Sequence, residues 1–291
     1  MRDFVITTDT TSDLPNDYIK KHNITVLPLT YVLEGITYNQ ENGLEFSEFY
    51  NKMRNGSMPT TSQVNPAQAR EIFLELYKQG FDILHIAFSS GLSGSYNSAR
   101  LAADELTEEY KDCNILVIDS LCASMGEGLL VLKAVQFKEQ GKTIEEIAEW
   151  IDKNKLHVCH DFTPMDLFHL YRGGRVSKTA AVIGTMVNVK PILHVDNAGH
   201  LIALSKVRGR KKSLTTLVDN MEKQIGSYLE ENKRDGVFIG HGDSLEDAQF
   251  VADLIKQRFG IETFLIDYIG PVVGAHTGAG IIALFFMGEA R

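Results

Sequence analysis

Short apolar runs alternate with longer amphipathic stretches along the chain of 291 residues. In the first half, the short runs end at polar or glycine-rich turns, which predicts buried strands. The stretches between them place apolar residues at helical spacing, as at Ile72, Phe73, Leu76 and Tyr77. The predicted strands are 4–6, 26–33, 82–88 and 114–118, and the predicted helices are 15–21, 66–79, 95–110, 123–140 and 144–153. This order predicts a parallel sheet with helices on both faces.

The second half follows a different pattern. Lys190–Val195 and His200–Lys206 predict a hairpin around the turn 196–199. Ser244 and Asp247 have the spacing of a capping box. The further predicted strands are 156–162, 237–240, 263–267 and 281–287, the predicted helices are 165–171, 178–187, 213–232 and 244–259, and 270–280 is predicted to be a glycine-rich loop. We therefore predict two domains, an N-terminal parallel-sheet α/β domain at 1–159 and a C-terminal α+β domain at 160–291.

Composition and charge narrow the class of protein. Hydrophobic residues make up 44% and charged residues 23%, which is ordinary for a folded domain. The formal net charge of −9 argues against a whole-protein electrostatic grip on nucleic acid. Residues 1–9 read as a strand rather than a secretory signal, and the longest apolar run, 281–287, is too short to span a bilayer. Three cysteines without a CxxC pair fit a reducing compartment, so we expect a cytoplasmic protein.

The charge is unevenly distributed along the chain. Residues 1–159 carry 14 Lys or Arg against 23 Asp or Glu, whereas residues 160–291 carry 15 of each. Within 172–212 there are nine basic residues and one acidic residue, Asp196. A local positive field suits an anionic ligand or an acidic partner. We predict that a charged partner or an anionic lipid surface approaches some of these basic residues, namely among Arg175, Lys178, Arg208 and Arg210.

Candidate binding chemistry lies in the turns. The turn 89–95 follows a predicted strand and opens a helix, whose free N–H groups attract anions, and Ser93 adds a hydroxyl donor there. Thr61 lies in a hydroxyl-rich loop at 59–63, and His276 lies in the loop 270–280, which has four glycines.

Several enzyme classes fit poorly. Gly91 and Ser93 begin a nucleophile-elbow pattern, but position 95 is serine rather than glycine. His157 and His160 on a strand point to opposite faces, so we predict no metal site. A serine hydrolase that uses Ser93 and His276 remains open, as does a generic binding protein for small anions.

An ordered set of motifs resembles the DegV family of bacterial fatty-acid-binding proteins, the binding subunits of fatty acid kinase. The matching segments are 9–15, 61–63, 90–96, 119–120, 172–175, 190–193, 241–243 and 270–278. Each motif is weak alone, but together they cover nearly the whole chain in the family's order. Two small departures are Thr10 and the segment 121–124, where the family often has serine and an Ala/Ser-rich stretch.

The resemblance implies that one long-chain fatty acid lies in an apolar tunnel and that no cofactor is needed. Thr61 and Ser93 would hold its carboxylate, with His276 and Arg175 nearby. A separate kinase subunit would phosphorylate that carboxylate, so the chain itself would not be the catalyst. The residues expected to support these loops are Thr10, Ser62, Gly94, Gly274 and Thr277, and those considered for the apolar lining are Phe264, Leu284, Phe285 and Phe286.

Overall fold

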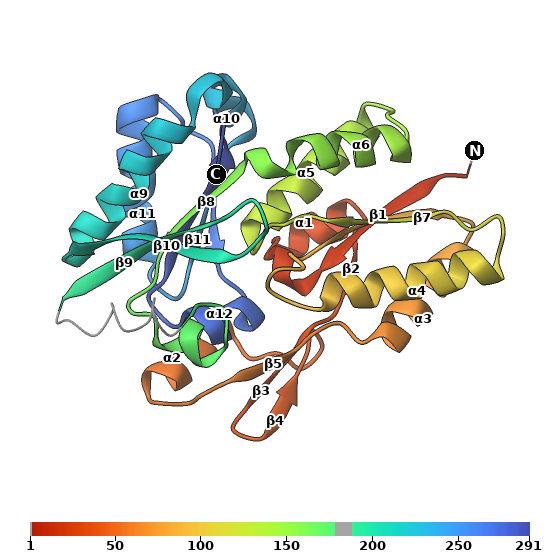
Figure 1. The fold of residues 1–291 in the computed structure, drawn as a ribbon, viewed down its shortest axis with the longest axis horizontal. Helices are drawn as coiled ribbons and strands as arrows, with labels where there is room; N and C mark the ends of the chain where they lie inside the picture. The colour runs from red at the N-terminus through yellow and green to blue at the C-terminus, as the bar shows by residue number, and fades with distance from the viewer. Residues whose placement is uncertain (1, 178–187) are drawn as a thin grey trace.

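The computed structural model describes residues 2–177 and 188–291. Two large sheets lie side by side, one from each half of the chain, and a small third sheet lies below them (Figure 1). The predicted helix at 178–187 and Lys178 lie outside the described residues.

The first sheet is fully parallel, as predicted, and its strand order is β2-β1-β6-β7. Its strands are β1 (Phe4–Asp9), β2 (Thr25–Leu27), β6 (Asp82–Ala87) and β7 (Ile115–Asp119), and its helices are α1 (Asn16–Lys21), α3 (Pro66–Lys78), α4 (Ser95–Glu109), α5 (Met125–Glu139) and α6 (Ile144–Asn154). Local chemistry fixes these boundaries. The Asn65 side chain caps α3 by accepting from the N–H groups of Ala67 and Gln68, and Thr143 forms a capping box with Glu146 at the start of α6.

The second sheet has six strands in the order β10-β9-β8-β13-β11-β12. Its strands are β8 (Val158–Thr163), β9 (Val189–Val195), β10 (Leu201–Arg208), β11 (Val237–His241), β12 (Phe264–Tyr268) and β13 (Ile282–Met287). β9 and β10 form the predicted hairpin. β13 is buried on both faces, because Ala283 and Phe285 join one hydrophobic cluster and Leu284 and Phe286 join another.

One subdomain was missed by the sequence pattern. The predicted strand 26–33 is wrong as a single element, because it divides between β2 of the first sheet and β3 (Thr30–Leu33) of a third sheet, ordered β4-β3-β5. β4 (Ile36–Tyr38), α2 (Phe46–Arg54) and β5 (Thr60–Ser62) complete this subdomain. The Tyr50 hydroxyl on α2 donates to the carbonyl of Ile269 at 2.6 Å, and Arg54 pairs with Asp243. These contacts attach the subdomain to the second half of the chain.

Three further predictions need correction. The helix predicted over 213–232 breaks into α9 (Arg210–Gln224), a short 3-10 turn and α10 (Leu229–Asp235), with Gly226 at a φ of +42° between them. Within the predicted glycine-rich loop, residues Pro271–Thr277 form the helix α12. The predicted capping box at α11 (Leu245–Phe259) is absent: the Ser244 side chain makes no capping bond, and the Asp247 carboxylate pairs with Arg210.

A division between residues 159 and 160 falls inside β8. Because all of β8 belongs to the six-stranded sheet, we propose that the domain boundary lies just before it.

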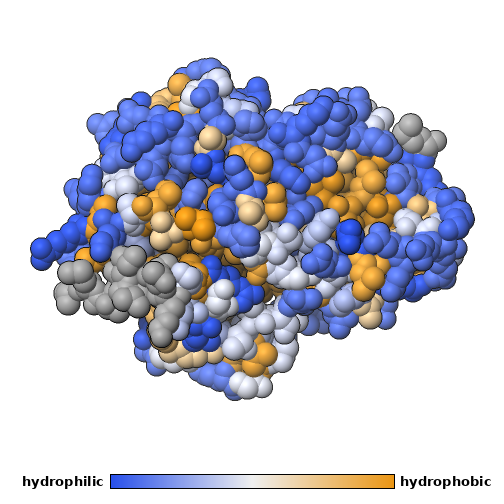
Figure 2. Space-filling view, viewed as in Figure 1, coloured by the Kyte–Doolittle hydropathy of each residue, from blue (hydrophilic) through white to orange (hydrophobic). Residues whose placement is uncertain are grey.

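In residues 2–177 and 188–291, no helix is long and apolar enough to cross a membrane. The face in Figure 2 is mainly hydrophilic, with separate hydrophobic patches.

Candidate functional site

A cavity lies where the two large sheets meet. It has about 190 Å³ of room for water-sized molecules, more than ten times what one buried water needs. Its wall comes from the turn after β6, the start of α5, strands β8 and β13, and helix α12. The open end of the parallel sheet, beyond the carboxyl ends of its strands, is where such folds bind ligands.

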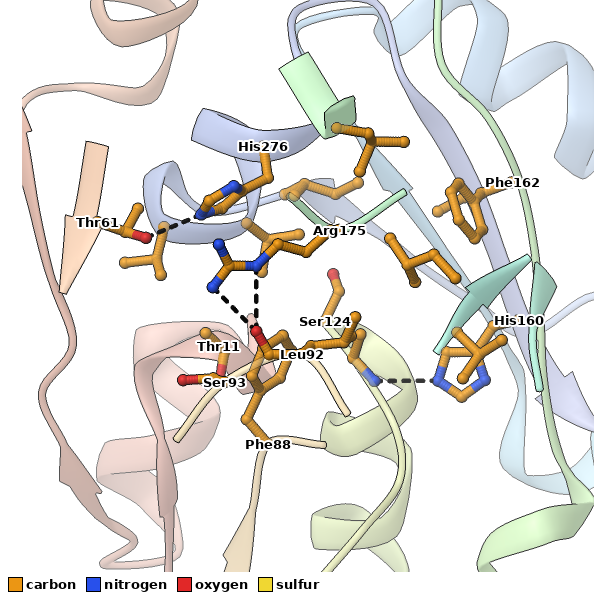
Figure 3. Close-up of a pocket in the computed structure, with 18 of the residues that line it drawn as sticks. Thr11, Thr61, Phe88, Leu92, Ser93, Ser124, His160, Phe162, Arg175 and His276 are labelled. Atoms are coloured by element: carbon orange, nitrogen blue, oxygen red, sulfur yellow. Dashed lines mark hydrogen bonds between the residues drawn. The ribbon is translucent and has the colours of Figure 1, made fainter. Parts of the chain in front are cut away.

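Four polar side chains from four separate elements gather at one end of the cavity (Figure 3). They are Thr61 on β5, Ser93 before α4, Arg175 after α7 (Phe168–Arg172) and His276 on α12. Thr61 Oγ1 and His276 Nε2 are 2.8 Å apart and share a hydrogen bond. Ser93 Oγ lies 2.9 Å from Ser95 Oγ. The structure thus brings together the four residues predicted to surround a carboxylate.

Two arginines give this end a positive charge that the described protein does not neutralise. Arg175 donates from Nε and Nη2 to the Leu92 carbonyl at 3.1 and 3.0 Å. Arg172 donates from Nη2 to the carbonyls of Pro59 and Ala275 at 2.6 and 3.2 Å. Among the described residues, neither guanidinium has a carboxylate within 4.0 Å. The field therefore favours an anion in the cavity.

His276 is neutral at this end. Burial, with the charges of Arg175 and Arg172, lowers the pKa of its imidazole from 6.5 to about 4. Gly173 lies directly against the ring, and a Cβ there would overlap His276 Nδ1. The close approach of the turn after α7 therefore requires glycine at 173, and it keeps Nε2 facing Thr61.

The rest of the cavity is mostly apolar. The apolar side chains of its wall are those of Leu29, Phe88, Leu92, Ala123, Phe162, Leu170, Val195, Leu201, Ile269, Val272, Val273, Ile281, Ala283 and Phe285. Of the four lining candidates on the C-terminal strands, only Phe285 lines the cavity. Leu284 and Phe286 point to the opposite face of β13, because successive residues of a strand face opposite sides. Phe264 packs against the hydrophobic cluster that contains these two residues. The cavity is amphipathic, with charge and hydroxyls at one end.

Comparison with known proteins gives the family. A family model described as "Uncharacterised protein, DegV family" matches residues 3–289. A DegV domain-containing protein of Clostridium perfringens, CPE0026, is 45% identical over 293 aligned positions, covering 100% of this chain and 99% of that protein. The chain belongs to the DegV family.

Solved DegV structures share the whole fold. A DegV family protein from Thermus thermophilus, whose structure is described as showing fatty acid binding, has a TM-score of 0.84 at 28% sequence identity. The match covers 99% of this chain and 100% of that protein. A stearic acid-binding protein from Eubacterium ventriosum has a TM-score of 0.88 at 26% identity, with 98% of both chains covered. The predicted resemblance and fold class are confirmed.

The residues expected to support the DegV site mostly lie behind its wall. Gly94 lines the cavity, and a Cβ there would overlap the Gln63 side chain. Thr10 Oγ1 accepts the N–H of Leu29 at 2.9 Å, and Thr277 Oγ1 donates to the Val273 carbonyl at 3.2 Å. Two others sit at subdomain contacts: Ser62 pairs with Thr30 across β5 and β3, and Gly274 packs under the Tyr50 ring.

Of the basic residues predicted to face a partner, Arg208 and Arg210 lie in different environments. Arg208 is exposed at the end of β10. Arg210 instead points inward, pairing with Asp247 at 2.7 Å and donating to the carbonyls of Thr163 and Gly280. Arg210 is therefore engaged within the fold, which leaves Arg208 as the better candidate for a partner contact.

Sequence reasoning missed a buried carboxyl group that contacts the segment 8–11 at the end of β1. Glu127, in the first turn of α5, accepts the hydroxyls of Thr8 and Thr11 at 2.7 and 3.1 Å and the N–H of Asp9 at 3.3 Å. Burial and the Asp9 carboxylate raise the pKa of Glu127 well above its usual value. The signal was present in Gly128, where a Cβ would overlap the Ser12 carbonyl, so α5 approaches this motif very closely.

Proposed function

We propose that this DegV protein binds one long-chain fatty acid in the cavity, with the carboxylate at Thr61 and Ser93 and the acyl chain among the apolar residues. Arg175 and His276 lie beside the head group in this arrangement. The observation that carries the proposal is the amphipathic cavity, in which one end holds hydroxyl donors and arginines that have no carboxylate partner among residues 2–177 and 188–291. Solved relatives described as fatty-acid-binding proteins support it.

The acyl chain supplies most of the binding free energy. At about 0.8 kcal/mol for each buried methylene, a chain of roughly 14 methylenes contributes about 11 kcal/mol before ordering costs are subtracted. The head-group contacts then fix orientation. Neutral hydroxyls hold a carboxylate without the tight ion pair that would reduce its reactivity, so an oxygen stays available.

We further propose that a separate fatty acid kinase phosphorylates the bound carboxylate and that this chain is its non-catalytic binding subunit. The basic stretch around Arg208 would approach the kinase or an anionic membrane surface. We place the protein in the cytoplasm, in keeping with its buried free thiols at Cys113, Cys122 and Cys159.

The geometry favours binding over hydrolysis by Ser93. A serine hydrolase needs its histidine on the nucleophile and a carboxylate on the other ring nitrogen. His276 Nε2 is bonded to Thr61, and Nδ1 lacks a hydrogen-bond partner within the described residues. Ser93 Oγ pairs with Ser95 instead.

Native mass spectrometry of the purified protein, followed by lipid extraction, tests the proposal. We expect one co-purified or added fatty acid per chain. A protein that binds no fatty acid at micromolar concentration, or whose Ser93 reacts covalently with a fluorophosphonate probe, would contradict it.

A further inference from the structure

A histidine lines the part of the cavity that lies opposite the polar residues. His160, on β8, lies across the cavity from Thr61 and His276 (Figure 3). Its Nδ1 donates to the Val158 carbonyl at 2.9 Å, and its Nε2 accepts the N–H of Ala123 at 3.2 Å. Both ring nitrogens are thus used by the fold, and the ring packs edge-on against Phe285 at 5.4 Å. His160 is a wall of the cavity rather than a head-group ligand.

One guanidinium, that of Arg291, forms hydrogen bonds to residues next to those that line this part of the cavity. Arg291 lies half-buried and donates hydrogen bonds to three segments that meet at this end of the cavity. Its acceptors are the carbonyl oxygens of Val158 (3.0 Å), Lys155 (2.6 Å), Leu121 (2.7 Å) and Asp196 (3.1 Å), and the Sγ of Cys122 (3.0 Å). Two of these contacts bear directly on His160. Val158 is its hydrogen-bond acceptor, and Cys122 precedes its donor, Ala123.

The segment that Arg291 holds is conformationally strained. Leu121 and Ser124 both have positive φ, at 52° and 53°, which non-glycine residues seldom adopt. Such conformations persist only where the surroundings impose them. Between them lies Ala123, whose N–H bonds to His160 and whose side chain lines the cavity. Arg291 bonds to the Leu121 carbonyl and the Cys122 Sγ, and these contacts add to the bond from the Leu121 N–H to Asp119 and the bond from the Ser124 hydroxyl to Asp13. Arg291 therefore helps to hold the Ala123 N–H against His160.

The third segment is the turn of the β9–β10 hairpin. Asp196 follows Val195, which lines the cavity, and Leu201 lines it from the other strand. Ser89 Oγ donates to the Gly199 carbonyl at 2.9 Å, so the turn is seated on the loop after β6. Arg291 therefore joins three segments that contribute to this part of the cavity wall.

We propose that Arg291 is a positioning residue that sets the chain-length limit of the acyl cavity by holding His160 and its neighbours in place. This inference rests on the proposed function, because it assigns the limit of the same fatty-acid site. Arg291 is remote from the head group, since its partners lie behind the opposite end. Its replacement therefore changes which chain lengths fit and leaves carboxylate binding intact.

Affinity measured across saturated straight-chain fatty acids from dodecanoic to icosanoic acid tests this. In the wild type, affinity should stop rising once the chain reaches His160. In Arg291→Ala it should continue to rise, and each added pair of methylenes that fits is worth about 15-fold. Arg291→Lys retains a cation without the planar fork and should lie between the two. Arg100→Ala, on the exposed face of α4, is the matched control and should keep the wild-type limit.

The outcomes separate the two proposals. A wild type that binds none of the fatty acids overturns the proposed function. A wild type that binds them, together with an Arg291→Ala protein that keeps the same limit or loses all lengths equally, overturns the role of Arg291 alone. Should Arg291→Ala not fold, His160→Ala tests the same wall, and a wild-type limit in that variant also overturns the inference.

Discussion

Replacing Ser93 by alanine should weaken fatty-acid binding while the fold survives. Ser93 is half-buried, and its Oγ bonds to the Ser95 hydroxyl at 2.9 Å and accepts the Ser95 N–H at 3.2 Å. The hydroxyl has further capacity as a donor toward the cavity. A hydrogen bond to a charged group contributes about 1.5–3 kcal/mol, so its removal should raise Kd roughly 10- to 150-fold.

The assay is isothermal titration of the wild type and Ser93→Ala with a fatty acid and with its methyl ester. The ester has the same chain but no carboxylate, so Ser93→Ala should lose far less affinity for the ester than for the acid. The loss for the acid should be the same at every chain length, because Ser93 faces only the head group. Thr60→Ala, which removes an exposed hydroxyl on β5, is the control and should bind as the wild type.

Two results would refute this reasoning. Unchanged affinity in both Ser93→Ala and Thr61→Ala would sink the assignment of the head-group site. An equal loss for acid and ester would show that Ser93 shapes the cavity rather than binding a carboxylate. A double-mutant cycle with Thr61→Ala then measures whether the two hydroxyls act on one group, since residues that share a ligand are not additive.

Four further predictions follow from the same contacts. Gly173→Ala should displace the His276 ring and lower fatty-acid affinity at least tenfold in the same titration, because a Cβ has no room there. The pKa of His276 is about 4 in the folded protein and 6.5 in the unfolded chain, so the unfolded chain binds more protons between these values and the free energy of unfolding falls as the pH drops through that window. In urea denaturation at a series of pH values, His276→Gln should lose less of this free energy than the wild type. Equal slopes of unfolding free energy against pH in the two proteins would contradict this. Glu127→Ala should cost about 2–6 kcal/mol in the free energy of unfolding, because it removes the acceptor of the Thr11 hydroxyl and of the Asp9 N–H, and a loss below about 1 kcal/mol would contradict the role of Glu127. Arg208→Glu should slow acyl-phosphate formation by an added fatty acid kinase without changing fatty-acid affinity, and normal turnover would remove Arg208 from the partner-facing surface.

The sequence predicted the parallel sheet because its signals are local. β6 is buried along its whole length around the apolar side chains of Ile83, Leu84 and Ile86, and Asn65-Pro66 begins α3 by a capping bond that depends only on neighbouring residues. The subdomain of β3, β4 and β5 has no such signal. Its strands are three or four residues long, and its core forms through distant contacts such as that of Tyr50 with Ile269. Periodicity cannot detect strands this short.

The candidate site shows the same division. Thr61, Ser93, Arg175 and His276 were found through motifs, and nothing in their spacing indicates that they meet. The contacts of Arg172, Glu127 and Arg291 were missed because their partners lie far away in the sequence, and those of both arginines are mainly backbone carbonyls. A carbonyl acceptor leaves no trace in residue identity, so only the fold reveals such contacts.

The division of charge along the chain has a structural counterpart in the cavity. The hydroxyl donors Thr61 and Ser93 come from the acidic first half, whereas Arg175 and His276 come from the neutral second half with its basic stretch. An anion seated among them contacts both halves at once. Because a ligand that binds only the folded state stabilises it by mass action, a bound fatty acid should raise the stability of the whole two-sheet assembly rather than of one half. The electrostatic field at the site is set by two arginines that have no carboxylate partner in the described structure, and not by the distant acidic surface. The net charge of −9 therefore does not oppose the binding of an anionic ligand.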